Sequence, residues 1–216
     1  MDQKVREFFS TVQTGVVTDA MYLLHLEGWM QDIFPLRPGT RVFGPAFTVQ
    51  ASPVTCNLPN YSVYELSELW QAGDVMLIDG LDAPCALMGE NMAHTCQYGG
   101  LSGLILNGRC RDYAEIRDLE LPVFAKGPAM RLKKGFLCFS HYNVPLNMAS
   151  AHVNPGDYIL GDMDGVLVFP AVCAEEIMYQ TEMIVEVEKE MEQAIRERWP
   201  IFKIKEIARK KSLPRK

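Results

Sequence analysis

The sequence lacks the motifs of several common protein classes. Its six cysteines form no Cys-x-x-Cys pair and its four histidines form no His-x-x-x-His group, which argues against zinc fingers, redox dithiols and zinc proteases. Neither G-x-G-x-x-G nor G-x-x-x-x-G-K-[ST] occurs, so no nucleotide site is expected. Because there is no apolar leader and no run of about 18 apolar residues, we expect a cytoplasmic protein with reduced thiols and no membrane contact.

What is present is the composition of a globular protein with an uneven charge. The 216 residues are 48% hydrophobic and 22% charged, with a net charge of -6. Residues 201–216 hold seven Lys/Arg and one Glu (+6), which leaves 14 Lys/Arg against 26 Asp/Glu (-12) in residues 1–200. We therefore predict one domain over residues 1–198 and a basic C-terminal extension over 199–216. The acidic body should repel nucleic acid, so binding to nucleic acid is expected only through this tail. The alternatives for the tail are a solvated segment and a helix with an apolar stripe against a subunit.

Apolar periodicity and turn residues predict an α/β fold. Short buried strands are predicted at 75–79, 103–107 and 122–126, separated by helices at 90–99 and 113–119, an alternation typical of parallel βαβ units. Residues 127–170 favour antiparallel strands. Further helices are predicted at 2–13, at 20–27 with Thr18 or Asp19 as its cap, at 61–71, and at 171–198, ended by Pro200.

The pattern Gly-Asp-x4-Asp occurs twice, at residues 73–79 and 156–162. A Gly-Asp pair before a strand is typical of a β-turn. We therefore interpret both copies as turns that lead into strands rather than as catalytic motifs.

Two polar clusters frame one predicted βαβ unit. Residues 89–92 (Gly-Glu-Asn-Met) stand where a helix begins, and free amide groups at such a place bind carboxylates or phosphates. Arg111 and Asp112 follow the strand 103–107, at the edge where α/β sheets usually bind ligands. An Arg beside an Asp suits an anion together with Mg²⁺, which takes one or two protein carboxylates. The pattern therefore indicates a divalent cation chelated by an α-keto acid.

Each cluster also has a purely structural interpretation. Asp112 and Glu115 have the spacing of an N-cap and the acid that completes a capping box, and Glu90 fits the acid expected in a first helical turn. Cys110 lies between two arginines, but no base accompanies it in the sequence, so we interpret it as a packing residue.

The motifs together resemble one known family. The stretches VVTDAM, GPAFTV and VNPGDYILGDMDGVLVFP, with the spacing Glu-x20-Arg-Asp from Glu90 to Asp112, look like the RraA-like family. Its members include class II 4-hydroxy-4-methyl-2-oxoglutarate aldolases and the regulator of ribonuclease E activity. The resemblance spans residues 5–190 in the family's order. It implies a compact α-β-β swivelling-domain fold with mixed sheets, flanking helices and a long C-terminal helix, assembled as a homotrimer or a dimer of trimers.

The resemblance also implies residue roles. The backbone of Gly89, Glu90, Asn91 and Met92 would hold the substrate's carboxylate, Arg111 its keto acid part, and Asp112 a Mg²⁺ or Mn²⁺ ion. Glu90 stands where aldolases of the family place an acid near the metal's waters, and Glu182 or Glu186 of a neighbouring subunit is a candidate further acid. The implied reaction is metal-dependent cleavage of a 4-hydroxy-2-keto acid through a pyruvate enolate, with decarboxylation of oxaloacetate through the same enolate.

A regulator that binds a ribonuclease or an RNA-processing partner is the alternative. The regulators of the family replace the metal-ligating Asp, whereas this sequence has Asp112. That difference favours the enzyme, while the basic tail favours the regulator.

Overall fold

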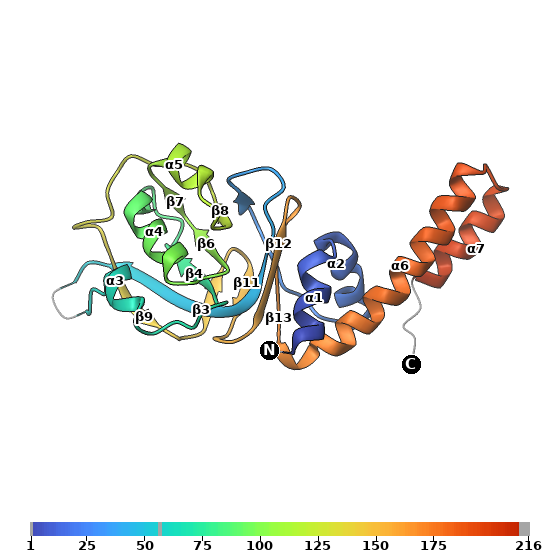
Figure 1. Cartoon of the computed structure of the whole chain (residues 1–216), viewed down its shortest axis with the longest axis horizontal. Coiled ribbons are helices and arrows are strands. Elements are labelled where there is room, and N and C mark those ends of the chain that lie inside the picture. Colours follow the sequence, from blue (N-terminus) through green and yellow to red (C-terminus); the bar gives the residue numbers. More distant parts are fainter. Residues whose placement is uncertain (1, 56–57, 212–216) are drawn as a thin grey trace. The chain divides into compact units, whose positions relative to one another are not determined.

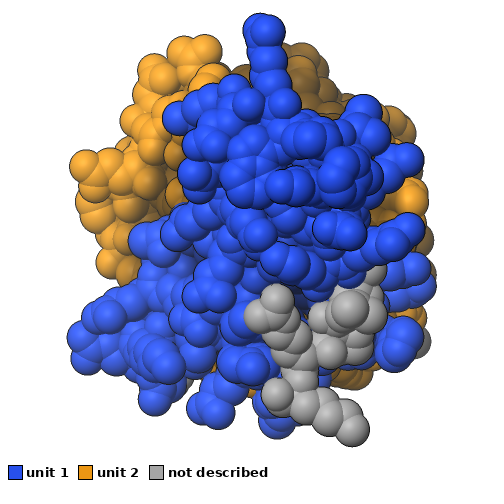
Figure 2. All heavy atoms as spheres, turned by 90° about the vertical axis from the view of Figure 1, so that its right-hand side faces the viewer, with its two compact units in different colours: residues 1–27, 172–216 blue, residues 28–171 orange. Residues whose placement is uncertain are grey.

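The structure is a computed structural model that describes residues 2–55 and 58–211. The chain forms two compact units, one made of residues 28–171 and the other of residues 1–27 with 172–216 (Figure 2). Each unit has a hydrophobic core cluster of its own.

The unit 28–171 is built on one mixed sheet (Figure 1). Its central strand β3 (Val42–Pro53) pairs in parallel with β4 (Val75–Asp79), β4 with β6 (Gly103–Asn107), and β6 with β8 (Val123–Ala125). All five residues of β4 and of β6 are buried, as expected for parallel strands covered on both faces. The predicted parallel core is thereby confirmed.

Most of the other strands of this unit pair in antiparallel fashion. They are β1 (Trp29–Met30), β2 (Phe34–Pro35), β9 (Leu137–Tyr142), β10 (Leu146–Met148), β11 (Ala151–Val153), β12 (Tyr158–Asp162) and β13 (Gly165–Phe169). β12 and β9 pair with β3, β13 with β12, and β10 with β11. The antiparallel character predicted for residues 127–170 is confirmed.

Three helices cover one face of the sheet. They are α3 (Val63–Leu66), α4 (Glu90–Tyr98) and α5 (Tyr113–Asp118), and they bury Leu66, Ala93 and Ile116 against the sheet in one core cluster. Other residues of the strands form a second hydrophobic core cluster, which includes Leu77, Ile105 and Met148. The helices predicted at 90–99 and 113–119 are confirmed within about one residue.

The unit of the two chain ends is helical. It contains α1 (Gln3–Thr11), α2 (Thr14–Leu23), α6 (Ala174–Arg196) and α7 (Ile201–Lys211); a 3-10 turn, η1 (Ala171–Cys173), precedes α6. α7 lies along α6, with Val187, Ala194 and Ile207 buried between them (Figure 1). Much of the predicted extension is therefore a packed helix, which agrees with the apolar-stripe alternative, although the stripe covers the chain's own α6.

Two predicted helices differ in the structure. The cap at Thr18 or Asp19 is wrong: α2 begins at Thr14, because Val16, Val17 and Ala20 continue its buried face upstream. The helix predicted over 61–71 is limited to Val63–Leu66, which a capping box of Ser62 and Glu65 begins. The chain then tightens, since Glu68 and Leu69 donate to carbonyls three residues back, as in a 3-10 turn.

The two Gly-Asp-x4-Asp copies form equivalent turns. Asp74 and Asp157 each accept an amide three residues back, from Gln71 and Asn154. Asp79 and Asp162 each accept an amide two residues ahead at the end of the strand. The interpretation as turns is confirmed.

The cysteines of the described chain are unpaired. Cys85, Cys96, Cys110 and Cys138 are buried and Cys173 is partly buried, while Cys56 lies outside the described residues. Within residues 2–55 and 58–211, no helix has the length and apolar character to cross a membrane.

Candidate active site

Two short strands bring the halves of the Glu-x20-Arg-Asp motif together. β5 (Ala86–Met88) and β7 (Arg109–Cys110) pair in parallel, with Met88 opposite Cys110. β5 leads into α4 and β7 into α5, so the beginnings of both helices lie side by side. The amide of Arg111 donates to the carbonyl of Met88 at 3.0 Å and continues this pairing. Arg111 and Asp112 therefore follow β7 rather than the predicted strand 103–107 directly.

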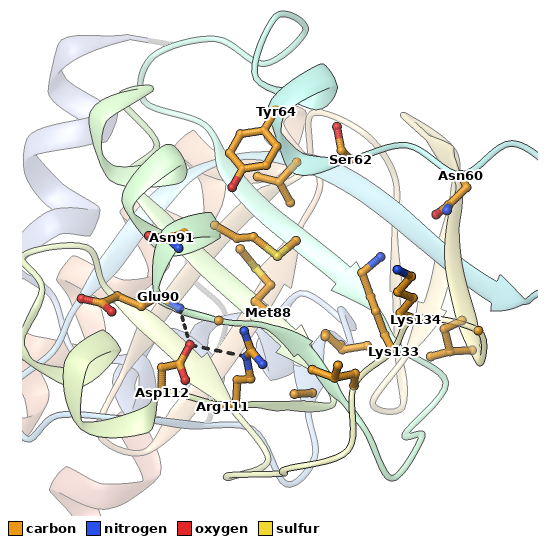
Figure 3. Close-up of a pocket in the computed structure, with 18 of the residues that line it drawn as sticks. Asn60, Ser62, Tyr64, Met88, Glu90, Asn91, Arg111, Asp112, Lys133 and Lys134 are labelled. Carbon is orange, nitrogen blue, oxygen red and sulfur yellow. Dashed lines mark hydrogen bonds and ion pairs between the residues drawn. The ribbon is translucent and has the colours of Figure 1, made fainter.

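Asp112 turns the chain so that its carboxylate faces α4. Its backbone is left-handed (φ 52°, ψ 44°), a conformation that Asp tolerates better than most residues. Its Oδ2 accepts the amide of Glu90 at 3.1 Å and lies 3.5 Å from Nε of Arg111 (Figure 3). The side chain makes no cap bond to its own helix α5. The capping-box interpretation of Asp112 is therefore wrong, because this carboxylate caps the neighbouring helix.

Gly89 leaves the space that this contact needs. A Cβ at position 89 would lie 2.6 Å from Oδ2 of Asp112 and 3.0 Å from Nε of Arg111. The backbone of Gly89 is extended (φ -132°, ψ -179°) and open to any residue. Glycine at this position therefore permits the close approach of the Asp112 and Arg111 side chains, and its backbone freedom is not used.

Glu90 contributes its backbone to the site, while its side chain turns outward. Figure 3 shows the Glu90 carboxylate pointing away from Arg111 and Asp112. One of its oxygens lies 3.5 Å from Nε2 of His94, one turn further along α4. The His94 ring stacks on Tyr98, and its buried Nδ1 has no hydrogen-bond partner among the residues that the structure describes.

A pocket of about 560 Å³ opens over this arrangement (Figure 3). Gly89, Glu90, Asn91, Met92, Arg111 and Asp112 all line it, so the structure brings together every site residue that the motif predicts. Asn91 lies in the first turn of α4, between Glu90, whose amide donates to Asp112, and Met92, whose amide donates to the carbonyl of Gly89. Apolar side chains supply much of the remaining wall: Val54, Val63, Leu87, Met88, Leu132 and Leu137.

Two adjacent lysines are among the pocket residues that the sequence analysis did not predict. Lys133 and Lys134 line the wall opposite Glu90 (Figure 3). The only signal in the sequence is the pair of adjacent lysines in Arg-Leu-Lys-Lys-Gly, which is also common in solvated turns. Because both lysines lie more than 20 residues after Asp112 in a segment without periodicity, no motif connected them to the site.

Cys110 is not an activated thiol. It is fully buried, and burial, with the Asp112 charge as a smaller contribution, raises the pKa of its thiol to about 11. A thiolate is the reactive form of cysteine, so Cys110 is inert near neutral pH. This supports its interpretation as a packing residue.

The donor chemistry of the pocket fits a hard cation that ligand and water help to coordinate. Over the described ranges, no three His, Cys, Asp or Glu side chains gather in a way that could hold a metal. Mg²⁺ and Mn²⁺ often take only one or two protein carboxylates, and their other ligands are water and substrate oxygens. The Asp112 side chain lines the pocket and is 37% exposed, so it offers such a carboxylate.

Comparisons with known proteins identify the family. A family model described as RraA-like, Aldolase/RraA, matches residues 14–168. A Halalkalibacterium halodurans protein provisionally named 4-hydroxy-4-methyl-2-oxoglutarate aldolase is 31% identical over 171 residues, which is 79% of this chain and 78% of that protein. The chain therefore belongs to the RraA-like family, and the family predicted from the motifs is confirmed.

Two further comparisons extend this result. Protein DlpA of Legionella pneumophila is 28% identical over 83% of this chain, but the match spans only 29% of DlpA. The solved structure of an uncharacterized protein from Pseudomonas syringae pv. tomato matches with a TM-score of 0.83 at 25% identity, covering 95% of this chain and 98% of that one. The predicted mixed α/β fold with flanking helices and a long C-terminal helix is thus shared over nearly the whole chain.

Proposed function

We propose that this protein is a divalent-metal-dependent carbon–carbon lyase that cleaves a 4-hydroxy-2-keto acid, as a 4-hydroxy-4-methyl-2-oxoglutarate aldolase does. The observation that carries the proposal is the joint placement of Asp112, Arg111 and the beginning of α4 on one pocket. The names of relatives at about 30% identity give independent support.

The chain's own groups would bind the keto acid end of the substrate. The beginning of α4 has a favourable dipole for a carboxylate. Because the Glu90 amide donates to Asp112 and the Met92 amide to Gly89, the amide of Asn91 would be the donor. Arg111 would donate to the keto oxygen, on which negative charge develops when the C–C bond breaks. Asp112 would hold Mg²⁺ or Mn²⁺, which when bound supplies Lewis-acid stabilisation of that charge. A lysine Schiff base is not needed for this chemistry.

Proton transfer would involve Glu90. The 4-hydroxyl of the substrate must lose a proton for the bond to break. Glu90 lines the pocket, and its carboxylate points away from Arg111 and Asp112 and toward His94, so a water molecule would have to carry the proton to it. We therefore assign Glu90 the role of receiving this proton through a water molecule. The same enolate, formed from oxaloacetate with loss of CO₂, would give a decarboxylase activity.

The assembly implied by the resemblance also belongs to this proposal. We propose a homotrimer or a dimer of trimers in which Glu182 or Glu186 of a neighbouring subunit reaches the site. Both side chains are exposed on α6.

The regulator is the weaker second candidate. Its main support was the basic tail, yet Lys210 pairs with Glu190, and Lys211 with Glu188 and Asp19. These contacts neutralise part of the tail's charge within the chain's own helical unit. Binding to nucleic acid or to a ribonuclease is therefore not proposed.

The test is pyruvate release from 4-hydroxy-4-methyl-2-oxoglutarate and oxaloacetate, with and without EDTA. We expect activity that EDTA abolishes and that Mg²⁺ or Mn²⁺ restores. Asp112→Asn should lower kcat about 100-fold or more, since the amide oxygen can still accept the Glu90 amide but carries no charge.

Asp118→Asn is the matched control, because Asp118 is an exposed acid of α5 whose partner is Arg117. This variant should keep full activity. Undiminished metal-dependent turnover in Asp112→Asn would contradict the proposal. Failure of every substrate at high enzyme concentration would favour the regulator, to be checked by ribonuclease inhibition.

A further inference from the structure

The pocket wall that carries the two lysines is fixed by the main chain. We call residues 127–136 the strap. The amide of Cys110 donates to Gly127 and that of Ala129 to Cys110, while Ala86 donates to Arg131 at 2.7 Å. The amides of Phe136 and Leu137 both donate to the carbonyl of Lys133 and close the turn at its end. The strap is thus bonded to the two strands that precede the motif residues.

The charges of the two lysines are not balanced by acids. Among the described residues, neither Lys133 nor Lys134 forms an ion pair, in contrast to Lys126, Lys210 and Lys211. Nζ of Lys133 lies 4.1 Å from the centre of the Phe139 ring. Burial lowers the pKa of Lys133 because it penalises the ammonium form. Two adjacent cations on one pocket wall repel each other unless an anion joins them.

The charge of the pocket is therefore opposite in sign to that of the chain. Arg111, Lys133 and Lys134 line it against two acids, Glu90 and Asp112. The Glu90 carboxylate faces outward, and Asp112 is engaged with Arg111 and the Glu90 amide. The pocket wall formed by the strap therefore has a positive charge, although the net charge of the protein is -6.

We propose that Lys133 and Lys134 determine substrate specificity by binding a second acidic group at the far end of the keto acid. This inference rests on the proposed function in taking Arg111 and the beginning of α4 as the site of the keto acid end. Lys133 should contribute more than Lys134, because it is half-buried and water screens its charge less.

Direct binding of two inert ligands of equal length tests this assignment. Both ligands are titrated in the presence of Mg²⁺. 2-Oxoglutarate has a carboxylate at its far end, and 2-oxopentanoate has a methyl group there. Neither ligand has the hydroxyl group that cleavage requires. Titration calorimetry should show that the wild type binds 2-oxoglutarate about tenfold to a hundredfold more tightly. Lys133→Gln should remove most of this preference and leave the affinity for 2-oxopentanoate unchanged, whereas Lys133→Arg should retain it.

Lys189→Gln is the matched control, since Lys189 is an exposed lysine of α6 with the same change in net charge. It should keep the preference. Equal weakening of both ligands in Lys133→Gln, a preference that survives in the double variant with Lys134→Gln, or binding of neither ligand by the wild type would overturn the inference.

The two proposals can fail separately. A preference that depends on the lysines without pyruvate release from any substrate would overturn the lyase and leave the assignment of the lysines standing. Turnover of hydroxy keto acids without the preference for 2-oxoglutarate would support the lyase and overturn the assignment of the lysines.

Discussion

A single oxygen of Asp112 organises the site at the scale of residues. It accepts the amide that begins α4, lies beside Arg111 and occupies the space left by the missing side chain of Gly89. The left-handed backbone of Asp112 is what aims the carboxylate at α4. An N-cap supplied by another segment both stabilises the helix and orients the proposed metal ligand.

Gly89→Ala should lower the activity of the protein much more than its stability. The added Cβ would lie 2.6 Å from Oδ2 of Asp112, so the carboxylate must move away from the Glu90 amide and from Arg111. We expect at least a tenfold loss of kcat with a change in Tm of only a few degrees, measured by the pyruvate assay and by thermal denaturation.

Gly15→Ala is a suitable control for this variant. Gly15 lies in α2, where a Cβ meets no atom within 4 Å, so activity should not change. If Gly89→Ala were as active as the wild type, the close contact would have no role in positioning Asp112.

The sequence predicts the motif residues that meet at the candidate site, but neither the direction of the Asp112 side chain nor the two lysines. Arg111 and Asp112 are predicted as ligand-binding residues because an Arg beside an Asp after a strand suits an anion and a cation, and because the resemblance to the RraA-like family favours this interpretation over a purely structural one. The direction of the Asp112 carboxylate depends on one left-handed residue, which no periodicity reveals. Lys133 and Lys134 reach the pocket through hydrogen bonds of the strap to distant strands, and such contacts leave no local pattern.

At the scale of elements, the length of a strand decides whether the sequence predicts it. The strands at 75–79 and 103–107 are continuous apolar runs between turns, and they form as expected. β5 and β7 have three and two residues, too few for any period to show, although they assemble the site. The sequence predicts an apolar stripe of Ile201, Phe202, Ile204 and Ile207 in the tail. The structure shows that Ile204 and Ile207 pack against α6, whereas Ile201 and Phe202 are exposed.

The packing of α7 on α6 predicts a contrast between two isoleucines. Ile207 is 4% exposed and Ile201 is 72% exposed. Ile207→Ala should lower the free energy of unfolding by about 2 kcal/mol, whereas Ile201→Ala should change it by less than about 0.5 kcal/mol. Urea denaturation followed by circular dichroism measures both. Equal effects would mean that α7 does not pack on α6 as described.

At the scale of the whole molecule, buried thiols link stability to alkaline pH. Burial raises the pKa of Cys96 from 9.0 to about 12 and that of Cys110 from 9.0 to about 11. Above pH 9 the unfolded chain loses these protons while the native protein keeps them, so the native state is the one that binds more protons. Stability should therefore be complete below pH 9 and fall as the pH rises through 11.

The expected loss from Cys110 alone is on the order of 2 kcal/mol by pH 11. Denaturant titrations at pH 8, 10 and 11 would measure it, with Cys110→Ala as the comparison. This variant should be less stable at pH 8 and should show a shallower alkaline decline. An unchanged decline would assign the alkaline sensitivity to other groups.

The bonds between Cys110 and the strap have a consequence for the length of the ligand. Cys110 precedes Arg111 directly, and its amide and carbonyl bond to Gly127 and Ala129 of the segment that carries Lys133. The separation between the two ends of the pocket is thus set by main-chain hydrogen bonds, which side-chain substitutions leave in place. Changes at positions 111, 133 and 134 should alter which chemical groups are recognised, while the chain length that fits between them stays constant.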